Sequence, residues 1–137
     1  MTALYESRER AVEAAEKLKI YAQPQRLMIL SRLLDGEHTV GEIFEATGVG
    51  QPALSQQLAE LRRAELVATR RAAKQVYYRL ADERAIVCVR CVEAIFGSGR
   101  DVAAALAAAL PGGATATAKT APRKLGSAGA AAFAKIV

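Results

Sequence analysis

The chain has 137 residues, of which 52% are hydrophobic and 24% are charged, and its formal net charge at pH 7 is +5. This length and composition predict one folded domain and exclude a chain that is disordered throughout. No run reaches the roughly 18 consecutive apolar residues of a membrane span, and the first residues lack the apolar core of a signal peptide. We therefore expect a cytoplasmic protein without a membrane partner.

Two helices are predicted at the start of the chain. Residues 6–22 repeat apolar side chains at intervals of three and four positions, which is the pattern of an amphipathic helix. A second helix begins near Pro24, a residue suited to the first helical turn, and ends at Gly36, a residue suited to a left-handed cap.

A short third helix is predicted after Thr39. Thr39 and Glu42 have the spacing of a capping box, in which each side chain binds a free backbone N–H at the start of a helix. Gly48 ends the helix. We expect three of its side chains to face the core, namely Val40, Ile43 and Phe44.

The fourth helix follows the linker 48–50. Leu54, Leu58 and Leu61 lie four and three positions apart, so they form one buried stripe. The other side must then be exposed, and it combines amide and hydroxyl side chains near its start with arginines near its end. Packing alone explains such a surface poorly. Its main members are Gln51, Pro52, Ser55, Gln56, Gln57 and Arg63.

Two short strands follow, at 67–71 and 75–80, and the second alternates apolar and polar residues. They predict a two-stranded hairpin with a basic tip that carries Arg70, Arg71 and Lys74. Residues 51–80 hold six basic side chains against two acidic ones, which indicates either a phosphate-binding surface or an ordinary solvated face. The tip has no Gly or Asn, so the turn type stays open.

A fifth helix is predicted from a cap at Asp82 to Phe96. Its apolar face, on which Ala85, Val89 and Val92 also lie, is wider than a hairpin can cover. A second copy of the same helix is the expected partner, which gives a two-fold homodimer through the first and fifth helices.

The composition changes near residue 97. Residues 101–110 can form one more Ala-rich helix, and the remainder is a low-complexity, basic segment. The predicted organisation is one domain over 1–96, followed by an Ala-rich helix and a basic tail over 97–137.

This order of elements is that of a winged helix-turn-helix, a mainly α fold with a β-hairpin wing. An α-helix fits the major groove of DNA, where Gln can pair with adenine and Ser with several bases. Basic side chains of the hairpin can follow the phosphates or the adjacent minor groove. The expected partner is double-stranded DNA.

Residues 48–82, GVGQPALSQQLAELRRAELVATRRAAKQVYYRLAD, resemble the helix-turn-helix and wing of the ArsR/SmtB family of small dimeric repressors. With AQPQRLMILSRLLDGEHTVGEI before them, the resemblance covers roughly 10–96 and is nearest to the persulfide-sensing and redox-sensing branch. It implies a homodimeric repressor on a palindromic operator, with wing residues on phosphates. It also implies that five residues face the bases: Gln51, Pro52, Ser55, Gln56 and Gln57.

Two positions depart from the family pattern. Gly50 stands where relatives usually have a capping Ser, which costs only a few tenths of a kcal/mol. Glu65 replaces the usual Gly before the first wing strand, and a left-handed conformation there would cost about 1 kcal/mol.

The resemblance does not carry over a sensor site. Metal-sensing relatives use cysteines on the third helix or Asp and His on the fifth, whereas here the third helix has no thiol and Arg84 stands where a ligand is needed. We therefore expect no metal at those sites and no cofactor. The only histidine, His38, is expected in a surface loop. Persulfide-sensing relatives pair a cysteine of the second helix with one of the fifth, but Ser31 occupies the former position.

The two cysteines, Cys88 and Cys91, both lie on the fifth helix, on one side of it. They can pack as small apolar residues in the dimer interface, act as a thiol switch for reactive sulfur or an oxidant, or bind As(III) or a soft metal with ligands from both chains. A thiol-disulfide oxidoreductase fits poorly, because Cys88 lies about two turns into its helix. A nonspecific architectural DNA protein fits the tail but not the polar helix face.

Overall fold

The structure is a computed structural model, and it describes residues 2–97 and 101–110. The chain forms two compact units with the boundary after Val89. The low-complexity tail predicted from residue 111 lies outside the described residues.

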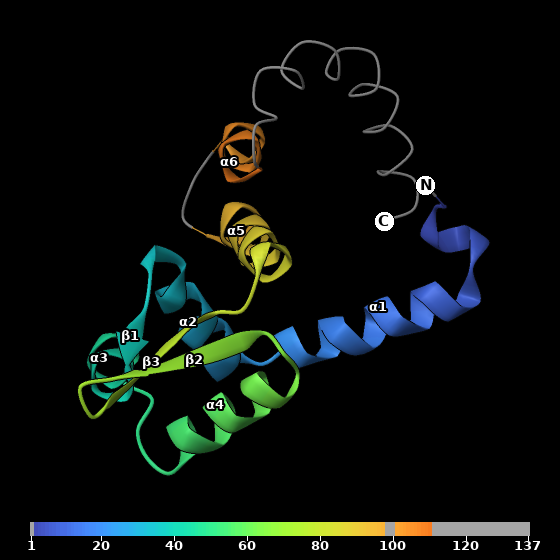
Figure 1. The fold of residues 1–137 in the computed structure, drawn as a ribbon. Coiled ribbons are helices and arrows are strands. Elements are labelled where there is room, and N and C mark those ends of the chain that lie inside the picture. Colours follow the sequence, from blue (N-terminus) through green and yellow to red (C-terminus); the bar gives the residue numbers. More distant parts are fainter. Residues whose placement is uncertain (1, 98–100, 111–137) are drawn as a thin grey trace. The chain divides into compact units, whose positions relative to one another are not determined.

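The elements follow the predicted order (Figure 1). The helices are η1 Leu4–Glu6, α1 Arg8–Tyr21, α2 Pro24–Arg32, η2 Leu33–Asp35, α3 Val40–Thr47, α4 Ala53–Arg63, α5 Glu83–Phe96 and α6 Val102–Ala109. The strands are β1 His38–Thr39, β2 Val67–Ala72 and β3 Gln75–Leu80. None of the helices in the described part of the chain is long and apolar enough to cross a membrane.

The predicted caps of α3 and α5 are present, whereas α2 ends at Arg32 and is followed by η2, and Gly36 has φ 130° and ψ −168° instead of the predicted left-handed helical cap. Thr39 Oγ1 accepts from the N–H of Glu42 at 3.2 Å, and Glu42 Oε1 accepts from the N–H of Thr39 at 3.0 Å, so the capping box of α3 is complete. Gly48 ends α3 with a left-handed φ of 76°. Asp82 Oδ1 accepts from the N–H of Ala85 at 3.0 Å and caps α5.

The sheet has three strands rather than the predicted two. Its order is β1–β3–β2, with both pairs antiparallel, and β1 pairs His38 with Tyr78 and Thr39 with Tyr77. The prediction missed β1 because two residues are too few to show an alternating pattern. His38 therefore lies in a strand and not in a loop.

The wing turn lacks Gly and Asn but still reverses the chain in two residues. Ala73 and Lys74 both have positive φ, 48° and 70°, which is the signature of a type I′ hairpin turn. Glu65 also has a positive φ, 64°, so the left-handed conformation considered from the sequence is present and costs about 1 kcal/mol.

The core of the first unit lies between the sheet and helices α2, α3, α4 and the first turns of α5. Leu54, Leu58 and Leu61 are at most 2% exposed, as predicted. Phe44 was expected in the core, but it is 48% exposed. Its ring lies against Gly50, which has no side chain to cover it, and Ile43 takes the buried position of α3.

Candidate nucleic-acid interface

Helix α4 exposes one polar side because its leucine stripe is fixed in the core. The helix packs against α2 and β2. Ser55, Gln56 and Arg63 are exposed, while the leucines one or two positions away are buried. At 3.6 residues per turn, the same leucines that anchor the helix thus set which side chains face solvent.

The side chain that caps the start of α4 does not come from the usual N-cap position. Pro52 has no side-chain acceptor to offer, and Gly50 has no side chain. Instead, Gln51 Oε1 accepts from the backbone N–H of Ser55 at 3.1 Å. Gln51 and Pro52 are both exposed, and the capping bond holds the Gln51 amide beside the first turn of α4.

The side chain of Gln56 is exposed, whereas that of Gln57 lies toward α2. The Gln57 side chain is half-buried, and Arg26 Nε of α2 donates to its Oε1 at 2.7 Å. Gln57 Nε2 donates to Gln25 Oε1 at 3.4 Å. Both ends of this amide are thus engaged within the protein. Arg26 also donates to the carbonyl of Ile20 at 3.2 Å, so it connects the end of α1 with α4.

The basic residues of the wing do not share one environment. Neighbouring residues of a strand point to opposite faces, so Arg70, opposite Tyr77, and Arg71, opposite Val76, lie on different faces of the sheet. Arg71 and Lys74 are exposed, and neither forms an ion pair within residues 2–97. Both are therefore wing cations available to an external anion.

Arg70 is already paired. Its Nη2 and Nε lie 2.7 and 2.9 Å from the two carboxylate oxygens of Glu37, and its guanidinium lies 5.0 Å from the centre of the Tyr77 ring. The hydrogen bond from Arg70 lowers the pKa of Glu37, and the same bond raises the pKa of Arg70. Sequence reasoning missed Glu37 because the pair joins residues 33 positions apart.

Arg63 has a weaker partner. It lies 3.0 Å from Glu60, one turn earlier on α4, and both side chains are more than half exposed. Exposed pairs of this kind contribute about 0.2–0.5 kcal/mol, so a phosphate can replace the carboxylate at little cost.

Cys88 and Cys91 are free, half-buried thiols on α5. Cys88 packs against the core and hydrogen-bonds to the hydroxyl of Tyr21 at the end of α1. Burial is the main cause that raises the pKa of Tyr21 far above its usual range, and the bond to Cys88 adds to it. The Cys88 thiol therefore touches the junction between α1 and the core.

His38 bridges two carboxylates. Its Nε2 lies 2.9 Å from Asp35 Oδ1, and its Nδ1 lies 3.3 Å from Glu42 Oε1. Because the two ring nitrogens point in different directions, the two carboxylates do not converge with the ring on one point. Within the part of the chain that the structure describes, no group of three or more His, Cys, Asp or Glu could hold a metal ion.

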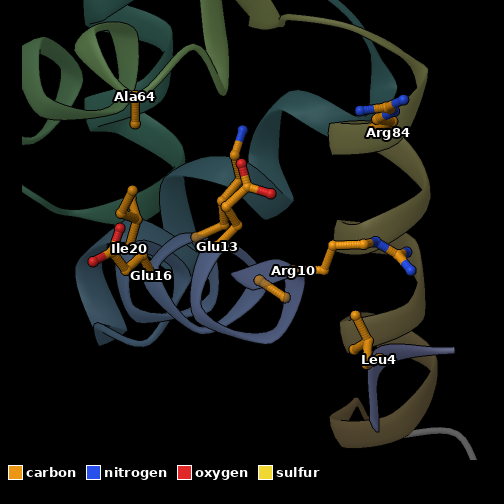
Figure 2. A pocket seen from close by; sticks show the side chains of 9 residues that line it. Leu4, Arg10, Glu13, Glu16, Ile20, Ala64 and Arg84 are labelled. Carbon is orange, nitrogen blue, oxygen red and sulfur yellow. The ribbon is translucent and has the colours of Figure 1, made fainter. Parts of the chain in front are cut away.

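An open groove of about 620 Å³ runs along α1 (Figure 2). Charged side chains of both signs line it, with apolar residues between them. The lining residues are Leu4, Arg10, Glu13, Ala14, Glu16, Lys17, Ile20, Ala64 and Arg84.

The order of helices, the outward polar side of α4 and the β-hairpin beside it define a winged helix-turn-helix, a class of DNA-binding proteins. Residues 23–69 match the family model described as "Bacterial regulatory protein, arsR family". The chain is 46% identical over 88 residues to the biofilm growth-associated repressor of Xylella fastidiosa, across 64% of this chain and 77% of that one. The chain belongs to the ArsR family of transcriptional regulators.

Solved structures agree with this assignment. The crystal structure of the transcriptional repressor BigR from Xylella fastidiosa is similar, with a TM-score of 0.63, 42% identity, and coverage of 69% of this chain and 93% of that one. The homodimeric winged helix-turn-helix DNA-binding domain of a possible ArsR-family regulator from Mycobacterium bovis is similar as well. Its TM-score is 0.57 with 33% identity, and the match covers 65% of this chain and 84% of that one.

Proposed function

We propose that the chain is a homodimeric transcriptional repressor that binds a palindromic operator in double-stranded DNA through α4 and the wing. One observation carries the proposal. Three buried leucines hold α4 so that Ser55 and Gln56 face outward, with no structural role for their side chains in the described residues. An exposed amide and hydroxyl on a fixed helix suit hydrogen bonding to base edges in the major groove.

The contacts divide into two kinds. Gln56, Ser55, Gln51 and Pro52 are proposed to lie against the bases, and Gln57 to hold α4 in place through α2. Arg63, Arg71 and Lys74 are proposed to bind phosphates, because they are exposed and either unpaired or weakly paired. Phosphate contacts give affinity, and base contacts give choice of site.

Dimerisation is supported by the exposed apolar side chains of α1. Val12 and Leu18 are 44% and 59% exposed, and Tyr5 of η1 is 88% exposed. A two-fold copy packed along α1 and α5 would cover these side chains. Sedimentation at micromolar concentration should therefore give a dimer.

Selection of duplexes from a random-sequence pool tests the reading of DNA directly. A homodimer with two α4 helices should enrich an inverted repeat. Recovery of a pool without any common sequence would contradict the proposal and leave only nonspecific, salt-dependent binding.

The proposed trigger for release is modification of the thiols of Cys88 and Cys91 by reactive sulfur or an oxidant. Cys88 is supported by its bond to Tyr21, because modification of the sulfur would change this contact between α5 and the end of α1. As(III) is the alternative inducer. It would need thiolates of both subunits, since one chain supplies two cysteines.

Mass spectrometry of the protein treated with a persulfide donor, peroxide or arsenite distinguishes these inducers. The variants Cys88→Ser and Cys91→Ser should then lose release from DNA under the same reagent. If the double variant releases DNA as the parent does, the cysteines only pack.

A further inference from the structure

The Glu37–Arg70 pair lies on one face of the three-stranded sheet, in which β3 lies between β1 and β2. Arg70 of β2 is directly opposite Tyr77 of β3, and Tyr77 is opposite Thr39 of β1. Residues opposite one another share a face, and so do residues two apart along an extended chain. Glu37, two residues before Thr39, is thereby brought to the Arg70 side of the sheet.

The geometry of the pair is unlike that of an ordinary surface ion pair. Arg70 donates through Nε and Nη2 to both oxygens of Glu37, at 2.7–3.2 Å. The Tyr77 ring lies beside the guanidinium, and Arg79 adds a second positive charge near the same carboxylate. Two-pronged arginine–carboxylate pairs hold their geometry better than single contacts between flexible side chains.

A carboxylate and a phosphate present similar pairs of oxygens to the guanidinium fork. While Glu37 occupies Nε and Nη2, that fork cannot bind a phosphate. Arg71 and Lys74 lack such a partner within residues 2–97, so the restriction applies to Arg70 and not to the wing as a whole.

We propose that Glu37 acts as an internal substitute for a phosphate and keeps Arg70 out of contact with DNA, so that Glu37 limits the affinity of the wing for DNA. This inference rests on the proposed DNA binding. In the parent protein, Arg70 then supports the structure of the wing and does not contact DNA. Glu37 sets how many phosphates the wing binds.

The test is the salt dependence of binding to a short mixed-sequence duplex, measured for the full chain. Each phosphate contact contributes about −0.9 to the slope of log K against log salt concentration. Glu37→Gln should make the slope steeper by about 0.9 per subunit engaged, because Arg70 becomes free. Arg70→Gln alone should leave the parent slope unchanged, and the double variant should return to it.

Glu45→Gln is the matched control. Glu45 is exposed on α3, and its side chain has no hydrogen bond or ion pair with the residues that the structure describes, so the substitution removes the same charge without releasing an arginine. A parental slope for Glu37→Gln, or equal steepening for both glutamine variants, overturns the inference. A slope that becomes shallower in Arg70→Gln alone also overturns it, because Arg70 would already bind a phosphate. If the parent binds no duplex at all, the proposed function fails and this inference with it.

Discussion

The bond between Arg26 and Gln57 gives a quantitative test of how α4 is held. Arg26 Nε donates to Gln57 Oε1 at 2.7 Å in a partly buried setting, which makes it a charge-assisted hydrogen bond. Such bonds contribute about 1.5–3 kcal/mol, and partial exposure places this one at the lower end. Arg26→Met also removes the bond to the Ile20 carbonyl, so we expect it to lower the free energy of unfolding by roughly 2–3 kcal/mol.

A double-mutant cycle isolates the contact. Arg26→Met, Gln57→Met and the double variant should give a coupling energy of about 1–2 kcal/mol in urea unfolding at one fixed protein concentration. Gln56→Met is the control, because its side chain is exposed and its effect should stay within about 0.5 kcal/mol. A coupling energy below about 0.5 kcal/mol would refute the assignment of Gln57 to the support of α4.

Three further changes test other parts of the structure. Glu65→Gly should stabilise the protein by about 1 kcal/mol in thermal or urea unfolding, because φ is 64° at this position. The control Ala64→Gly, at φ −81°, should destabilise the protein, and stabilisation by both substitutions would show that backbone strain is not the cause. Leu58→Ala should cost about 2–5 kcal/mol, since a side chain 2% exposed leaves a cavity, and a loss below 1 kcal/mol would place Leu58 outside the core. The bond from His38 lowers the pKa of Asp35, so the stability from this carboxylate is present above its unfolded pKa near 4 and is lost as the pH falls through the lower folded value. In His38→Gln, the free energy of unfolding should fall less steeply as the pH is lowered through that range. The same pH dependence in the variant and the parent would contradict this role for the pair.

The helices were predictable because their signals are local. The Thr39–Glu42 capping box, the stop at Gly48 and the leucine stripe of α4 each depend on residues within one or two turns. The same spacing also indicates on which side of α4 Gln57 lies, and the prediction did not use this information. Gln57 is three positions after Leu54 and four before Leu61, so it lies on the buried side of α4.

The features that the sequence did not predict depend on distant contacts. Strand β1 has two residues and forms only because β3 is beside it. The pairing of Arg70 with Glu37 depends in turn on β1, which brings a residue 33 positions away to the wing. A count of basic residues predicts a positive wing, but it does not tell which of the arginines are already neutralised by a neighbour.

The most direct test of the central claim is competition between the selected inverted-repeat duplex and mixed-sequence DNA at fixed salt, for the parent, Gln56→Ala and Lys74→Ala. If the outward side of α4 reads bases, Gln56→Ala should lower the preference for the selected site by about 1–3 kcal/mol per base pair read. Lys74→Ala should weaken both duplexes alike and reduce the salt slope by about 0.9. An unchanged preference in Gln56→Ala, with equal losses on both duplexes, would show that α4 does not select the site.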